Sequence, residues 1–159
     1  MSRLIPTARR LLLCSLLLAA SRVEAQTTFA VRPVQNLAFG ALLPGVPTTV
    51  DPLQLTQSGQ IEVKASIGAI FEILYTLPSA MTSGSNTLPL SFLNTSGGAA
   101  ASPTPSSVIR FDPRFPKSFQ YVTTDRATFF LGGRASPRIG QPTGSYSAPV
   151  IVTITNLGV

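Results

Sequence analysis

The sequence has very few of the residues on which enzyme chemistry most often depends. It contains one cysteine, Cys14, and neither histidine nor tryptophan. The absence of histidine removes the commonest general base and metal ligand. A single cysteine cannot form a disulfide within the chain, and any thiolate or zinc–thiolate chemistry would depend on that residue alone. Much of enzymology is therefore excluded before any motif is considered.

The first 25 residues have the pattern of a secretory signal peptide. Three arginines precede an apolar run over residues 11–20, and Val23-Glu24-Ala25 is similar to a small-residue cleavage site. The apolar run is too short to span a bilayer. It also continues past Cys14, which argues against a lipoprotein. We expect cleavage after Ala25 and a single mature domain over residues 26–159.

Loss of the leader would change the composition of the protein. The leader carries four of the twelve basic residues and one of the six acidic residues, so the net charge would fall from +6 to about +3. Such a small, dispersed excess is not the footprint of a nucleic-acid-binding protein. The mature chain would have no cysteine, so packing and sheet hydrogen bonds alone must hold it together.

The composition of the mature chain is typical of strands. Val, Ile, Thr, Phe and Tyr recur, Pro and Gly interrupt them at short intervals, and no long stretch has helical spacing. Many short strands predict an all-β sandwich or barrel. The predicted strands are 27–34, 36–39, 48–53, 60–66, 70–77, 87–93, 108–111, 118–123, 127–131 and 146–155. The predicted turns are 40–47, 58–59 and 79–86, and residues 97–107 are predicted to form a mobile loop.

Aromatic residues mark the expected core of this sandwich. The strand at 70–77 is apolar on both faces apart from Glu72, which indicates a central position. The expected core phenylalanines are Phe71, Phe92, Phe129 and Phe130. A ligand groove lined by these rings is the alternative interpretation.

The clearest strand pattern closes the chain. Its apolar residues share one parity and its polar residues the other: Tyr146, Ala148, Val150, Val152 and Ile154 against Ser147, Thr153 and Thr155. This period of two indicates one buried and one solvated face. An edge strand also offers unpaired backbone groups to another chain. A candidate strand-addition interface on this segment therefore comprises Tyr146, Val150, Val152 and Ile154.

The same interface is expected to include residues at the mature N-terminus. Phe29 and Val31 are apolar and two residues apart, and Thr27 and Pro33 share their parity. This is the minimum pattern for filling pockets in the sheet of a neighbour. The sequence leaves two alternatives open: residues 27–34 are either such a donor strand or the first strand of their own domain.

Other patterns with chemical meaning have simpler explanations. Arg110–Phe119 interleaves basic and aromatic residues, as single-strand nucleic-acid binders do. Its two prolines and local charge instead favour a surface loop with its aromatics tucked into the core. Lys64 and Lys117 lie in no Ser-x-x-Lys or Gly-x-Ser-x-Gly pattern, and the aspartates lack the spacing of a calcium loop. We expect no enzyme activity, no cofactor, no metal site and no nucleic-acid partner.

Three segments, in this order, resemble one family. Residues 36–45 are similar to the early Leu-x-Phe-Gly … Pro-Gly signature of the DUF4402 proteins, relatives of the spore coat protein U group of pilin-like subunits. Residues 71–88 resemble the family's middle strand and its Thr-x-Gly-x-x-Thr-Leu turn. Residues 131–133, then 141–146 and the closing strand, resemble its Gly-Gly … Gln-Pro-x-Gly-x-Tyr ending. The resemblance covers almost the whole mature chain.

The resemblance implies an immunoglobulin-like, pilin-like β-sandwich exported to the periplasm, the cell surface or beyond. It also implies assembly by a periplasmic chaperone and an outer-membrane usher, with an N-terminal extension of a neighbour supplying a missing strand. Related subunits carry a longer segment before the Phe-Gly motif, and many carry a disulfide; this chain departs from both. We expect a structural or adhesive subunit of a surface appendage or coat, with other copies or related subunits as partners. The alternative is a stand-alone secreted domain that binds a glycan or matrix ligand.

Overall fold

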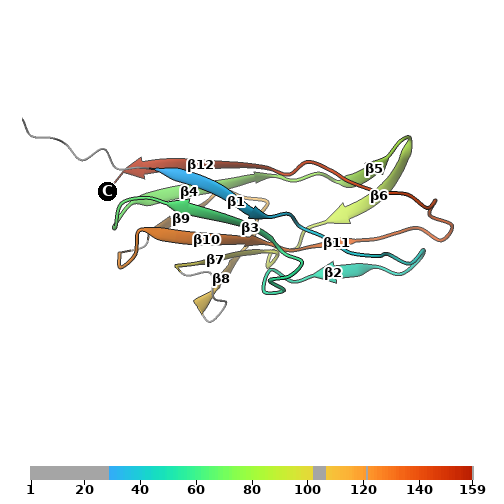
Figure 1. Ribbon diagram of the computed structural model, residues 1–159, viewed down its shortest axis with the longest axis horizontal. Coiled ribbons are helices and arrows are strands. Elements are labelled where there is room, and N and C mark those ends of the chain that lie inside the picture. Colours follow the sequence, from blue (N-terminus) through green and yellow to red (C-terminus); the bar gives the residue numbers. More distant parts are fainter. Residues whose placement is uncertain (1–28, 102–106, 121, 159) are drawn as a thin grey trace, which may run out of the picture.

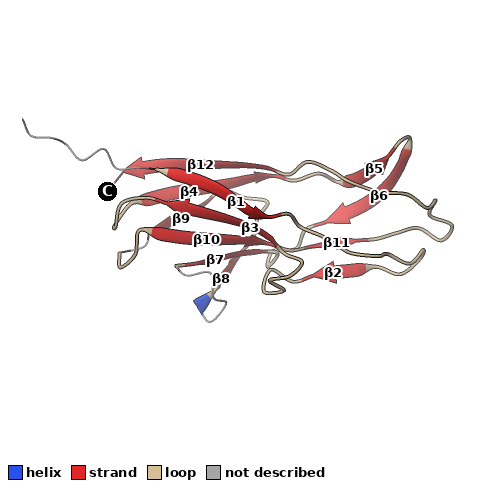
Figure 2. Cartoon of the chain, in the orientation of Figure 1, coloured by secondary structure: helices blue, strands red, loops and turns tan. Residues whose placement is uncertain are grey.

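The computed structural model describes residues 29–101, 107–120 and 122–158, and this part of the chain is all-β (Figures 1 and 2). The predicted leader, and Thr27 of the predicted N-terminal strand, lie outside the described residues. Within the described part, no helix is long and apolar enough to cross a membrane. The predicted β-sandwich fold is confirmed.

The described strands form three antiparallel sheets. In chain order they are β1 (Ala30–Gln35), β2 (Thr48–Val50), β3 (Gly59–Lys64), β4 (Ile70–Thr76), β5 (Ala80–Ser83), β6 (Asn86–Ser91), β7 (Gly97–Ala100), β8 (Ile109–Phe111), β9 (Lys117–Gln120), β10 (Arg126–Leu131), β11 (Gly133–Ala135) and β12 (Ile151–Gly158). The strand orders are β1-β3-β10-β7-β8, β12-β4-β9 and β2-β11-β6-β5. The first two sheets form a sandwich at one end of an elongated molecule, and the third extends towards the other end (Figure 1).

The main core lies between the five-stranded and three-stranded sheets. Ile73 of β4 and Phe129 of β10 are fully buried in it. The Phe129 ring meets Phe71 and Phe119 edge to face, with centroids 5.9 Å and 5.3 Å away. The phenylalanines expected in the core are all buried: Phe71, Phe92, Phe129 and Phe130. The strand β4 is central in its sheet, between β12 and β9, as predicted.

A glycine carries the chain from the main sandwich into the third sheet. Gly132 alone separates β10 from β11, and its N–H donates to the Ser96 carbonyl oxygen at 2.8 Å. A Cβ at this position would overlap the Val50 carbonyl oxygen and press on Pro52. A second, smaller core follows under the third sheet, formed by Phe39, Val50, Met81, Leu88 and Ala135.

Two segments predicted as loops contain strands. Residues 79–86 were expected to be a turn, but most of them form the hairpin of β5 and β6, and only the tight connection at Gly84 (φ 58°) is a turn. Residues 97–107 were expected to be a mobile loop, but they begin with the fully buried strand β7. Its glycines permit close packing, because a Cβ on Gly97 would lie 2.8 Å from the Phe111 ring. Residues 102–106 lie outside the described part.

Two predicted strands are misplaced at the edges of the sheets. Residues 36–39 form no strand, because Leu37 and Phe39 pack into the cores without a neighbouring ladder. The closing strand begins at Ile151 rather than residue 146 and continues to Gly158. Before it, the extended segment 146–150 is tied to β5 by a single bridge between Ser147 and Thr82. Pro149, which has no N–H to donate, lies in this irregular stretch.

Candidate binding groove

Two sheet edges flank one long side of the molecule. The strand β1 ends the five-stranded sheet, and β12 ends the three-stranded sheet. Within the described residues, no strand pairs with the outer edge of either one. The two strands lie on the same side of the sandwich (Figure 1). The sandwich therefore has an unclosed seam between β1 and β12.

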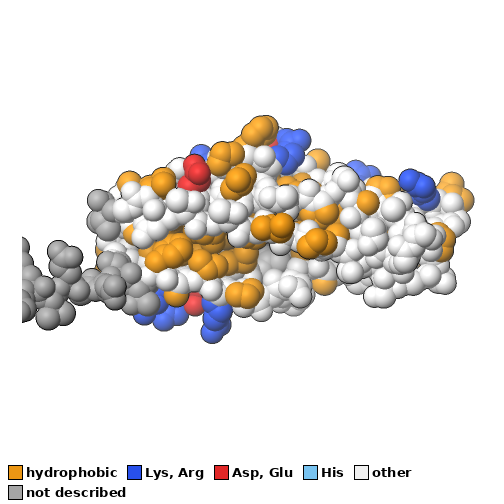
Figure 3. Space-filling model, turned by 90° about the horizontal axis from the view of Figure 1, so that it is seen from above, with side chains coloured by type: hydrophobic (Ala, Val, Ile, Leu, Met, Phe, Trp, Pro, Cys, Tyr) orange, Lys and Arg blue, Asp and Glu red, His pale blue; other side chains and the backbone are white. Residues whose placement is uncertain are grey.

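A groove of about 520 Å³ follows this seam, and we call it the edge groove. Its walls are Pro33 and residues 35–37 on the β1 side, and residues 146–150 and Val152 on the β12 side. Tyr75, Phe129 and Leu131 are among its other lining residues. Figure 3 looks onto this side and shows hydrophobic side chains gathered in an elongated hollow, with charged side chains towards the margins. The groove therefore lies over the main core, and half-buried apolar residues that pack against that core line it.

The β12 side of the groove has the parity predicted from the sequence. The predicted inward residues are all half-buried, and those between them are exposed: Tyr146, Ala148, Val150, Val152 and Ile154 against Ser147, Pro149, Ile151, Thr153 and Thr155. Val150, Val152 and Ile154 pack against the main core, and Tyr146 packs against the second core. Half-burial of every inward residue indicates a wall that is covered on one side only.

The other predicted interface residues, Val31 on β1 and Phe29 just before it, do not line the edge groove. Residues Ala30–Gln35 pair antiparallel with β3, so this segment is the first strand of its own domain. Val31 lies opposite Val63, and directly opposed residues share a face of the sheet. Val63 is buried in the core, yet Val31 is 46% exposed. Val31 is thus only partly covered, while Phe29 packs partly against the main core.

The edge groove contains no charged side chain among the described residues that line it. It continues into a second hollow of about 710 Å³, whose lining includes residues 37–42, Pro44, Pro137 and residues 141–146. That lining is also uncharged. The turn on this side is held by Tyr146, whose hydroxyl donates to the Pro142 carbonyl oxygen and accepts from the Gln141 amide, both at 2.8 Å. The whole recess suits an extended, uncharged segment of chain better than a charged ligand.

One polar atom in this region has no partner. The hydroxyl of Tyr75 is buried and makes no hydrogen bond in the described part of the chain. Burial raises the pKa of Tyr75 well above its usual value, so the hydroxyl stays neutral at physiological pH. A buried unpaired hydroxyl costs free energy.

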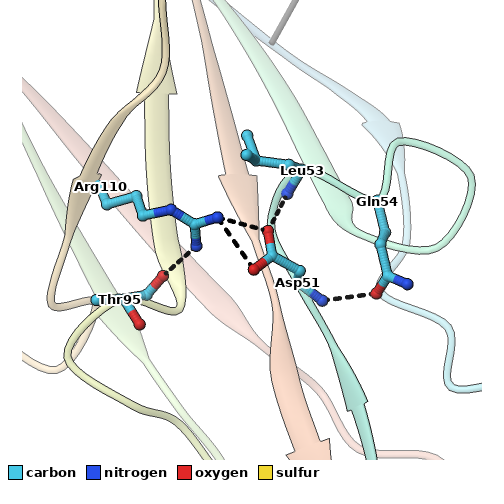
Figure 4. Close-up of polar contacts among 5 residues, drawn as sticks. All are labelled: Asp51, Leu53, Gln54, Thr95 and Arg110. Carbon is cyan, nitrogen blue, oxygen red and sulfur yellow. Dashed lines mark hydrogen bonds and ion pairs between the residues drawn. The ribbon is translucent and has the colours of Figure 1, made fainter.

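The side chains of the basic–aromatic segment at Arg110–Phe119 are divided between the core and the surface. Phe111 and Phe119 pack into the core as expected, whereas Phe115 is 62% exposed. The guanidinium of Arg110 donates to both carboxylate oxygens of Asp51, at 2.9 and 3.0 Å, and to a carbonyl oxygen in the neighbouring turn at 3.3 Å (Figure 4). Arg110 therefore braces β8 against the loop that follows β2.

The charge of Asp51 is stabilised by this brace. Burial raises the pKa of Asp51, but hydrogen bonds from Arg110 and from the Leu53 N–H, together with the charge of Arg110, outweigh it. The net effect holds the pKa below its usual value. The ion pair is about half-exposed, so it contributes no more than about 1 kcal/mol to stability.

Sequence patterns identified the β12 wall but missed much of the groove. Leu37, Phe39 and Met81 line it, although they lie in segments predicted as a strand or a turn that the structure does not contain. Within the described residues, no group of three or more His, Cys, Asp or Glu side chains could hold a metal ion. No family model matches the chain, and no curated protein matches it at a significant level.

Proposed function

We propose that this protein is an exported structural or adhesive subunit of a surface appendage or coat, completed by a strand from another subunit. The observation that carries the proposal is the edge groove, an uncharged and largely apolar recess between two unpaired sheet edges. Strand addition supplies backbone hydrogen bonds along an edge and places alternate side chains in pockets. The outer edge of β12 offers unpaired backbone groups, and the lining of the groove offers apolar surface for alternate side chains.

The strand order supports the same proposal. The order β1-β3-β10-β7 corresponds to the A-B-E-D sheet of an immunoglobulin fold, and β4 and β12 correspond to C and F. In that fold a further strand, G, pairs with F. The outer edge of β12 lies where that strand would pair. The resemblance to spore coat protein U-like subunits points to the same kind of assembly.

Export is the second part of the proposal, and it rests on the leader pattern in residues 1–25. Mass spectrometry of the exported fraction should find an N-terminus at Gln26, either free or cyclised to pyroglutamate. A mature species that retains Cys14, especially a lipidated one, would refute the cleavage step.

Strand addition can be tested with the purified mature protein and a synthetic strand. The probe is a nine-residue peptide with Val or Phe at alternate positions and Ser or Thr between them. We expect saturable binding and a raised melting temperature, because a ligand that binds only the folded state stabilises it. A peptide of the same composition in scrambled order, without the alternation, is the control. Equal effects of the two peptides, or none from either, would argue for a stand-alone domain.

A further inference from the structure

The first strand, β1, is already paired within its own domain. The strand β1 lies against β3 from Ala30 opposite Lys64 to Gln35 opposite Gln60, with one irregularity in the register between Pro33 and Gln35. The amide of Gln35 also donates to the carbonyl oxygens of Leu55 and Ser58, at 2.9 and 2.8 Å. If β1 moved into the groove of another copy, it would leave the edge of β3 uncovered. Exchange of β1 between copies therefore creates as many open edges as it closes.

If the leader is cleaved after Ala25, few residues remain before β1 for a second strand. Three residues would then precede Phe29, and fully extended they would span about 10 Å at ~3.3 Å per residue. The β12 wall from Tyr146 to Val152 is seven residues long, which corresponds to about 23 Å at the same rise. The mature N-terminal segment is therefore too short to fill the groove of another copy while β1 stays in place.

We infer that this chain accepts a strand but does not donate one, so that its edge groove takes a segment of a different protein and the chain occupies the end of a row of subunits. The inference rests on the proposed function. The chemistry of the occupant follows from the lining: an extended segment of at least seven residues, uncharged on its inward face, with large apolar side chains at alternate positions. The outward face of the occupant is not constrained, because it points to solvent.

The test compares self-association with binding of the alternating nine-residue peptide, using the mature chain. The variant Ala30→Cys/Lys64→Cys locks β1 onto β3 through an opposed pair on the solvated face, where both side chains are exposed. We expect the wild type and the oxidised variant to sediment as monomers at all concentrations. We also expect both to bind the peptide with the same affinity.

A matched pair of substitutions tests whether the peptide binds in the edge groove. Val150→Arg places a charge on the inward wall and should weaken peptide binding at least about tenfold, because the charge would be buried without a partner. Ile151→Arg, one residue on and 59% exposed, should leave binding unchanged. Wild-type multimers that the β1 lock abolishes would overturn the inference and leave the proposed function standing. The inference would also be overturned if the wild type and the oxidised variant both formed multimers and Val150→Arg abolished them. Monomers that bind no strand would refute the proposed function itself.

Discussion

Replacement of Phe129 by alanine tests the packing of the main core most directly. The side chain is fully buried, and its ring meets Phe71 and Phe119 edge to face. Truncation of a buried Phe to Ala costs about 3–5 kcal/mol. Each lost edge-to-face contact is worth about 0.5–1.5 kcal/mol, which favours the upper part of that range. Total stabilities of small domains are about 5–15 kcal/mol, so Phe129→Ala should remove a large fraction of the stability.

Urea denaturation followed by circular dichroism measures this loss. For a slope of about 2 kcal/mol per molar urea, a loss of 4 kcal/mol lowers the midpoint by about 2 M. Phe115→Ala is the control, because that ring is 62% exposed and surface substitutions usually change stability by less than about 0.5 kcal/mol. A loss below about 1 kcal/mol for Phe129→Ala, or equal losses for the two variants, would show that the core is not packed as described.

Three further predictions follow from the fold. Gly132→Ala should destabilise the domain by about 1–3 kcal/mol, because its Cβ would overlap a carbonyl oxygen of β2; an unchanged urea midpoint would contradict this. Val152→Asp should lower the melting temperature far more than Thr153→Asp, since only Val152 points inward. Equal effects would show that the assigned register of β12 is wrong by one residue. The depressed pKa of Asp51 gives a contribution that is present above its unfolded pKa of 3.8 and lost as the pH falls through the lower folded value. Asp51→Asn should therefore lose less stability than wild type between pH 5 and pH 2, as pH-dependent melting would reveal.

The sequence predicted the elements whose side chains alternate most clearly. The inward parity of the closing strand, the central position of β4 and the core phenylalanines follow directly from period-two patterning and burial of aromatics. The strand β7 was missed because its sequence, Gly97–Ala100, has the composition of a loop. Its residues must be small because the Phe111 ring on the adjacent strand β8 lies close to Gly97. Local sequence does not encode this tertiary contact.

The edge groove was only partly predictable for a similar reason. Phe29, Val31 and the apolar residues of the closing strand indicated an interface, but the sequence could not decide whether residues 27–34 pair with their own domain. That choice depends on the β1–β3 register, which joins segments about thirty residues apart. The other wall includes Asn36, Leu37 and Phe39. In the sequence, these residues lie in a segment that indicated family resemblance rather than a cavity.

The orientation of the strands has a mechanical consequence. The long strands of the sandwich, β4 and β12 among them, run along the longest axis of the molecule (Figure 1). A pulling force along that axis loads all the hydrogen bonds between β4 and β12 together, in shear, whereas a crosswise force opens them one after another. Resistance to forced unfolding depends on the unfolding rate rather than on equilibrium stability. The domain should therefore be mechanically anisotropic, stiff along its length and weak across it.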